Sequence, residues 1–113
     1  MYLGIDLGTS GVKATLIDSG QRVLASQTAA LTVQRPQPMW SEQNPADWIA
    51  ATETALAALA RAHDLSELRG IGLSGQMHGA VALDAGGAVL RPAILWNDTR
   101  SHVEAAELDA APQ

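Results

Sequence analysis

The chain has 113 residues, which is enough for one domain at most, and its 47% hydrophobic and 17% charged residues are typical of a globular protein. Twelve acidic and seven basic residues give a net charge of −5, which argues against a nucleic-acid-binding surface because such surfaces need basic residues. The absence of cysteine excludes disulfides and thiolate metal sites. The N-terminus does not resemble a signal peptide and no apolar run is long enough to cross a membrane, so we expect a cytoplasmic protein.

The first predicted element is a β-hairpin formed by residues 2–8 and 12–18. Apolar and polar side chains alternate after the glycine-rich turn, which is typical of a strand and not of the helix that a dinucleotide-binding loop requires. The Walker spacing is absent as well. Asp6 lies just before a turn that carries hydroxyl groups and glycines. Because an unpaired buried aspartate is costly, this pattern indicates a phosphate-binding turn, and an ordinary hairpin with a polar turn is the alternative.

A strand and a helix are predicted next. The strand, residues 23–28, runs antiparallel to the second strand and leads through a proline-containing connection to the helix. Asn44 is a favourable N-cap and Pro45 fits the first helical position, so we expect the helix to run from there to about His63. Its expected buried stripe consists of Trp48, Ala51, Ala55, Leu59 and Ala62.

The last third of the chain is predicted to contain short strands and a second helix. The expected strands are residues 68–74, 80–84, 89–90 and 92–96. Asp98 or Thr99 is expected to cap the helix, which runs to about Ala110. Arg100 is expected to neutralise nearby acidic groups.

Residues 4–13 resemble the first phosphate motif of the actin-like ATPase superfamily. Residues 71–79 and 92–100 resemble the FGGY carbohydrate kinases, a family of that superfamily. The string Gly-Gln-Met-His-Gly at 75–79, together with Trp-Ser-Glu-Gln at 40–43, is most similar to the xylulokinases of that family. The similarity extends over nearly the whole chain.

The resemblance implies an α/β fold, namely the actin-like ATPase (ribonuclease-H-like) domain, with a mixed sheet, antiparallel hairpins and flanking helices. FGGY kinases are several-fold longer and have two domains that close on a cleft, so residues 1–113 would form only the N-terminal portion of the first domain. The remainder of that domain and all of the second domain would lie beyond Gln113. They would include the catalytic aspartate that acts as base, so the chain alone is expected to be inactive.

The resemblance also implies ATP and Mg²⁺ as cofactors and D-xylulose as the substrate. Asp6 would be catalytic and would organise the Mg²⁺. The phosphate groups would be held by Gly8, Thr9, Ser10, Gly11 and Lys13. The sugar would be bound by Gln76, Met77, His78, Trp96, Asn97 and Asp98.

Each side chain also has a structural interpretation. Asp6 could cap its turn, Lys13 could be a solvated strand lysine, and His78 could be a satisfied structural histidine. Trp96 could pack in the core, and Asp98 could cap the following helix. Two other functions stay open: a different FGGY kinase (ribulokinase, gluconokinase or fuculokinase), and a non-catalytic sugar-binding module. The oligomeric state is undetermined, and a homodimer of the full-length protein is one option.

Overall fold

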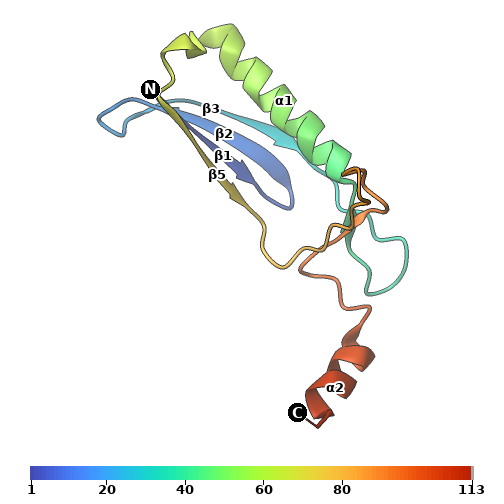
Figure 1. Cartoon of the computed structure of the whole chain (residues 1–113). Coiled ribbons are helices and arrows are strands. Elements are labelled where there is room, and N and C mark those ends of the chain that lie inside the picture. Colours follow the sequence, from blue (N-terminus) through green and yellow to red (C-terminus); the bar gives the residue numbers. More distant parts are fainter. Residues whose placement is uncertain (113) are drawn as a thin grey trace.

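A computed structural model describes residues 1–112, and four of its strands form one mixed sheet (Figure 1). These strands are β1 (Tyr2–Leu7), β2 (Gly11–Ile17), β3 (Val23–Ala30) and β5 (Gly70–Gly75). They lie in the order β3–β2–β1–β5, with β2 antiparallel to both of its neighbours and β5 parallel to β1. The predicted hairpin and third strand are confirmed, and the predicted strand at 68–74 begins two residues later as β5.

Helix α1 (Pro45–Ala62) connects the hairpin side of the sheet to β5 and covers one face of the sheet (Figure 1). It begins as predicted: the Asn44 side chain accepts a hydrogen bond from the Ala46 amide at 3.0 Å, and proline occupies the first turn. Ala51, Ala55 and Leu59 are buried, as expected. The prediction for Ala62 is wrong, because this residue lies in the last turn and is exposed.

The core lies between α1 and the facing side of the sheet. Leu3, Val12 and Ala14 are among its buried members, and they point toward the helix because side chains alternate along each strand. The residues between them point to the opposite face, which no element of residues 1–112 covers. This uncovered face carries Asp6 and Lys13, so the polar half of the predicted site is open to solvent.

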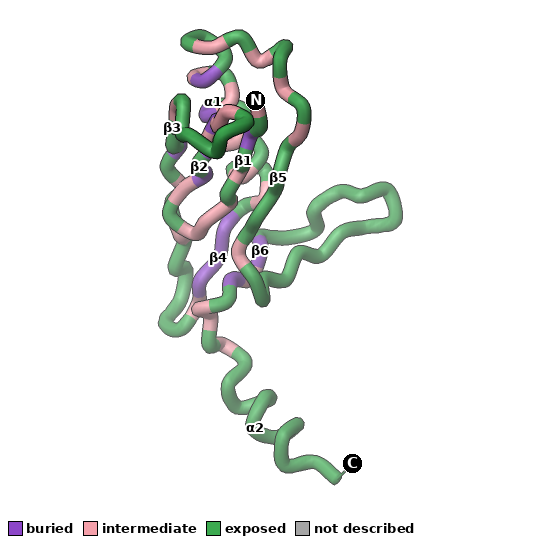
Figure 2. Tube along the Cα trace, turned by 90° about the vertical axis from the view of Figure 1, so that its left-hand side faces the viewer, coloured by how far each residue is buried: buried purple, intermediate pink, exposed green. Residues whose placement is uncertain are grey.

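The apolar cover of the sheet ends before β5. Helix α1 packs mainly against β2 and β3, and it leaves Ile71 and Leu73 of β5 60% and 78% exposed. Figure 2 shows this difference as a continuous exposed trace along β5 beside the partly buried hairpin strands.

The rest of the chain is less regular than predicted. A short helix η1 (Leu65–Glu67) precedes β5, and β4 (Glu42–Gln43) pairs antiparallel with β6 (Ala93–Ile94), the only part of the predicted strand 92–96 that forms. The predicted strands at 80–84 and 89–90 are wrong as regular strands. They form only isolated bridges, of Ala80 with Ile94 of β6 and of Leu83 with Val89, and the segment extends away from the four-stranded sheet (Figure 2).

Helix α2 (His102–Ala110) extends away from the sheet and has no buried residue (Figure 1). Its N-cap is Ser101, which makes no side-chain cap bond. The predicted cap at Asp98 or Thr99 is therefore wrong. No helix within residues 1–112 is both long and apolar enough to span a bilayer.

Gly11 is required by the close approach of β3. A Cβ atom at this position would lie 2.8 Å from the backbone oxygen of Ala29, whereas a Cβ atom at Gly72 would meet nothing within 4 Å. We therefore expect Gly11→Ala to lower the free energy of unfolding by about 1–3 kcal/mol, because the strands must move apart. Gly72→Ala is the matched control and should be neutral or slightly stabilising. Urea unfolding of the chain measures both, and equal stability of the two variants would contradict the close packing.

Candidate functional site

Asp6 lies near the end of β1 on the open face of the sheet. The strand register places it between Lys13 of β2 and Ser74 of β5, and these residues line a concavity of about 420 Å³. The Ser74 hydroxyl donates a hydrogen bond to Asp6 Oδ1 at 2.9 Å. Within residues 1–112 no turn amide donates to Asp6, so the alternative that this acid caps its turn is not what the structure shows.

The turn after Asp6 is tight and presents unused donors. Gly8 N–H donates to the backbone oxygen of Gly11 at 2.9 Å, which closes the turn. The amides of Thr9 and Ser10 donate no hydrogen bond within residues 1–112, and Ser10 is exposed. Successive free amides at a turn form an anion-binding concavity, so the amides of this turn can donate hydrogen bonds to phosphate oxygens.

The Thr9 hydroxyl is engaged in other hydrogen bonds and is not free to bind a phosphate group. It donates to Gln76 Oε1 at 3.3 Å and accepts from the indole nitrogen of Trp96 at 3.1 Å. Thr9 therefore joins the turn to the second group of predicted site residues.

That second group gathers around a smaller pocket. Gln76, Met77, His78 and Trp96 line a hollow of about 270 Å³ beyond the end of β5. Met77 and Trp96 are 72% and 58% exposed, so Trp96 is not a core residue. His78 adopts a left-handed backbone conformation with φ of 60°, which turns the chain sharply at the pocket.

The first concavity lies on β1, β2 and β5, and the second begins at Gln76, two residues after Ser74. The Gln76 amide donates to the backbone oxygen of Leu7 at 3.0 Å, which extends the β1–β5 pairing to the edge of the pocket. The residues that line one concavity do not line the other, so residues 1–112 place the acid and the Met77–His78 pair close in the fold but in separate hollows.

Asn97 and Asp98 do not line the pocket. Asn97 Oδ1 is buried and has no hydrogen-bond partner within residues 1–112, which leaves an acceptor free. Asp98 is turned toward β4, where its Oδ2 accepts a hydrogen bond from the Ser41 amide at 2.7 Å.

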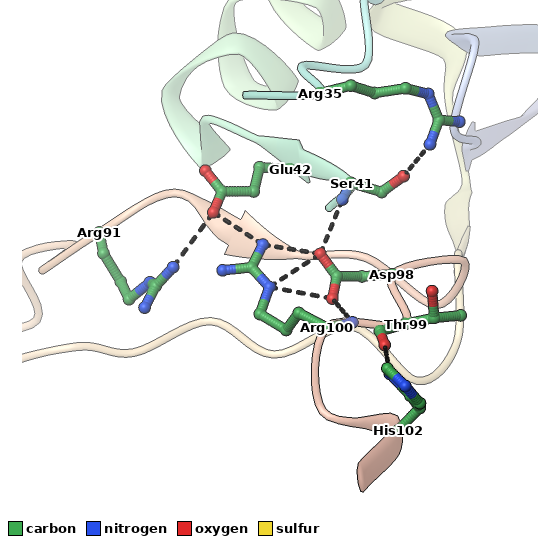
Figure 3. A network of polar contacts seen from close by, with 8 residues as sticks. All are labelled: Arg35, Ser41, Glu42, Arg91, Asp98, Thr99, Arg100 and His102. Carbon is green, nitrogen blue, oxygen red and sulfur yellow. Dashed lines mark hydrogen bonds and ion pairs between the residues drawn. The ribbon is translucent and has the colours of Figure 1, made fainter. Parts of the chain in front are cut away.

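Asp98 belongs to a cluster of charged side chains that Figure 3 shows. Arg100 donates to Asp98 through both Nε and Nη2, at 2.9 and 2.6 Å, and its Nη2 also reaches Glu42 Oε1 at 2.8 Å. Arg91 contacts the same Glu42 oxygen, and the Arg100 guanidinium lies 3.7 Å from the centre of the Trp40 ring. The prediction that Arg100 neutralises nearby acids is confirmed.

The charge state of Asp98 follows from these contacts. Hydrogen bonds from Arg100 hold the pKa of Asp98 far below its ordinary value, and the Ser41 amide acts in the same direction against the opposing effect of burial. The carboxylate is therefore ionised and already satisfied by protein donors. This arrangement favours a role in fixing the β4–β6 region.

Two polar residues were missed at the sequence level. Ser74 could have been found from strand register, since a parallel strand after the helix places it beside Asp6. Gln43 is buried and contacts both Thr9 and Gln76, and the Trp-Ser-Glu-Gln string at 40–43 gave it no role because those partners are distant in the sequence.

The site offers few ligands for a metal ion. Within residues 1–112 no group of three or more His, Asp or Glu side chains could hold one. Mg²⁺ in nucleotide sites is held by one or two carboxylates, with waters and phosphate oxygens completing its shell. Asp6 is exposed and is the only carboxylate that lines its concavity, so the residues present fit that kind of site.

Comparison with known proteins identifies the family. Residues 1–112 match the family described as the FGGY family of carbohydrate kinases, N-terminal domain. The chain belongs to this FGGY family. The FGGY fold is confirmed by a crystal structure described as a xyloylose kinase from Brucella ovis, which is 63% identical, covers 96% of the chain and superimposes with a TM-score of 0.94. The xylulose kinase from Rhodospirillum rubrum superimposes with a TM-score of 0.90 at 36% identity over 96% of the chain.

The match covers less than a quarter of the FGGY relatives named here. The xylulose kinase of Escherichia coli K12 is 54% identical over 110 residues, which are 97% of this chain and 23% of that protein. The chain likewise covers 23% of the Brucella structure and 22% of the Rhodospirillum structure.

The charged cluster predicts a pH dependence. Because the folded state lowers the pKa of Asp98 from 3.8, its contribution to stability is complete above about pH 4 and is lost as the pH falls toward the folded-state pKa. We expect Asp98→Asn to lower the free energy of unfolding at pH 7, and the difference from the parent chain to shrink below pH 3.8. Urea unfolding between about pH 2.5 and 7, which covers the upper part of this window, measures the difference. Glu107→Gln, which removes the same charge from exposed α2, is the control, and a difference for Asp98→Asn that stays constant with pH would contradict the assignment.

Proposed function

We propose that this chain is the N-terminal part of an ATP-dependent kinase that phosphorylates D-xylulose to D-xylulose 5-phosphate. The observation that carries the proposal is its 54% identity, over 97% of its length, to a xylulose kinase. The placement of the site residues supports it, because an anion-binding turn and a pocket with polar and aromatic walls adjoin at one end of the sheet.

The phosphate side of the site follows from the turn and the open face. The free amides of Thr9 and Ser10 and the Ser10 hydroxyl would bind phosphate oxygens, and Lys13 would add a charge-assisted hydrogen bond. Asp6, whose carboxylate Ser74 orients, would hold Mg²⁺. When bound, Mg²⁺ neutralises charge on the phosphate groups.

The acceptor side follows from the small pocket. The His78 imidazole can both donate to and accept from sugar hydroxyls, and Met77 supplies an adaptable apolar wall. The exposed Trp96 ring can cover the C–H face of a sugar, and the free Asn97 Oδ1 is an available acceptor. Asp98, which protein donors saturate, would act by holding this loop in place.

A base for the attacking hydroxyl is the main group that these residues do not supply. Phosphoryl transfer needs both reactants aligned and charge neutralised, with an acid or base at the acceptor hydroxyl. We propose that this base and the second wall of the cleft come from the part of an FGGY kinase that corresponds to the remaining length of the relatives.

A chimera tests the proposed function. This chain replaces the segment that it matches in the E. coli xylulose kinase, and the product is assayed for sugar-dependent ADP formation. We expect turnover with D-xylulose. Asp6→Asn should lower kcat by at least about 100-fold, and His78→Ala should raise the KM for xylulose by about 10-fold. Glu107→Gln is the control. A folded chimera that prefers ribulose or gluconate would support another FGGY specificity, and one that is inactive on all sugars would contradict the proposal.

The chain by itself should not catalyse phosphorylation of the sugar. Pure residues 1–113 with MgATP and D-xylulose are expected to form no sugar phosphate above the background of the Asp6→Asn variant. Robust turnover by the pure chain would show that a base is present within it. Calorimetric titration with xylulose in the same buffer would separate a binding module from an inert fragment.

A further inference from the structure

A buried glutamine connects the turn after β1 to the pocket beyond the end of β5. Gln43, the last residue of β4, is 2% exposed. Its Nε2 donates to the backbone oxygen of Thr9 at 2.7 Å, and its Oε1 accepts from the Trp48 indole at 2.9 Å and from Gln76 Nε2 at 3.3 Å. One side chain therefore contacts the phosphate turn, the loop of the sugar pocket and helix α1.

The neighbours of Gln43 fix the orientation of its amide. An indole N–H can only donate and a backbone oxygen can only accept. If the amide were flipped, its NH₂ group would face the Trp48 indole N–H, and its oxygen would face the Thr9 oxygen. Both contacts would be repulsive in a buried place, so one orientation is strongly favoured.

The same logic orients the rest of the network. Gln76 gives its Nε2 proton to Gln43, so its Oε1 is free to accept from the Thr9 hydroxyl. The Thr9 hydroxyl in turn accepts from the Trp96 indole, which is a donor only. The proton of Thr9 is thus directed toward Gln76 and is not available to a phosphate oxygen.

We propose that Gln43 is a positioning residue of the phosphoryl-transfer site, which sets the sugar pocket relative to the phosphate-binding turn. Gln43 is buried and lines neither concavity, so it acts through Thr9 and Gln76. The Thr9 hydroxyl belongs to this network, and only the main chain of Thr9 serves phosphate. This inference rests on the proposed function, because it matters for catalysis only if a phosphoryl group passes between the two sites.

Misalignment has a specific chemical signature. In the aligned site the sugar hydroxyl attacks the γ-phosphorus of ATP, a new P–O bond forms, the bond to the β-phosphate oxygen breaks, and the hydroxyl proton is released. In a misaligned site water takes the place of the sugar hydroxyl, and the products are ADP, inorganic phosphate and a proton. The ratio of free phosphate to sugar phosphate reports alignment independently of how much protein is active.

The first test examines the network in the chain itself by ¹H–¹⁵N NMR. The sequence has three tryptophans, so three indole N–H signals report on it, and Trp40 lies outside the network beneath Arg100. We expect Gln43→Met to shift the Trp48 and Trp96 signals and to leave the Trp40 signal in place. Gln27→Met, an exposed change on β3, is the matched control and should shift none of them. A Trp96 signal that Gln43→Met leaves unmoved would overturn the network.

The second test examines catalysis in the chimera. We expect Gln43→Met to lower kcat with xylulose by about 10- to 100-fold and to raise the ratio of free phosphate to sugar phosphate, because small misplacements of reactants are costly. Gln27→Met should change neither quantity. If the parent chimera is active and Gln43→Met keeps both its kcat and its product ratio, the inference is wrong; an inactive parent chimera refutes the proposed function instead.

Thr9→Val provides a second variant in case Gln43→Met does not fold. It removes one hydroxyl and leaves the Gln43–Trp48 bond intact, so the Trp96 indole signal should shift and the Trp48 signal should stay. We expect it to raise the product ratio as well, with little change in the KM for ATP. A large rise in the KM for ATP, with an unchanged product ratio, would show that the Thr9 hydroxyl binds phosphate and would overturn this assignment.

Discussion

The parallel pairing of β1 with β5 is the constraint on which the rest of the site depends. Its register sets Asp6 opposite Ser74 and Leu7 opposite Gly75, and one further backbone bond fixes Gln76 at the strand end. Helix α1 makes this pairing possible, because parallel strands need a crossover connection and the helix packs its apolar stripe on the hairpin while it returns the chain. Without this register Asp6 would not lie beside Ser74, two residues before Gln76.

Two buried polar groups complete the arrangement on the other side of the site. Gln43 and Asp98 would each destabilise the fold if they lacked partners. Gln43 donates to the distant Thr9 backbone oxygen and accepts from the nearby Trp48 indole, and Asp98 accepts from the distant Ser41 amide and from the nearby Arg100. Because every partner has a fixed hydrogen-bonding role, these contacts specify one geometry for the loops. The loops around the pocket are thereby held by polar contacts in a region where regular secondary structure is scarce.

The sequence predicted those parts of the fold that have a local signal. Alternating apolar residues located the hairpin, and Asn44 with Pro45 located the start of α1, because capping and periodicity act over a few residues. The region after β5 was less predictable. Asp98 resembles a helix cap by position, yet its partners are Arg100 and the Ser41 amide, which lies 57 residues away in the chain. Nothing local in the sequence indicates that contact.

For the candidate site, the motifs around Asp6 and Met77 predicted two halves, and these residues line two separate concavities. That one half binds phosphate and the other binds sugar stays a prediction. The roles within each half depend on hydrogen-bond direction, which the order of residues does not reveal. Thr9 illustrates this: its residue type suits phosphate, but its hydroxyl proton is directed to a glutamine 67 residues further along the chain.

The bond between Asp6 and Ser74 also has a consequence for the order of assembly. It joins residues that are 68 positions apart, so the intervening chain must close a long loop before the contact can exist. The N-terminal hairpin, whose contacts are local, can form early and already displays the carboxylate. A ligand that touches both strands would therefore recognise only molecules in which β5 has paired with β1, and its binding would stabilise that pairing.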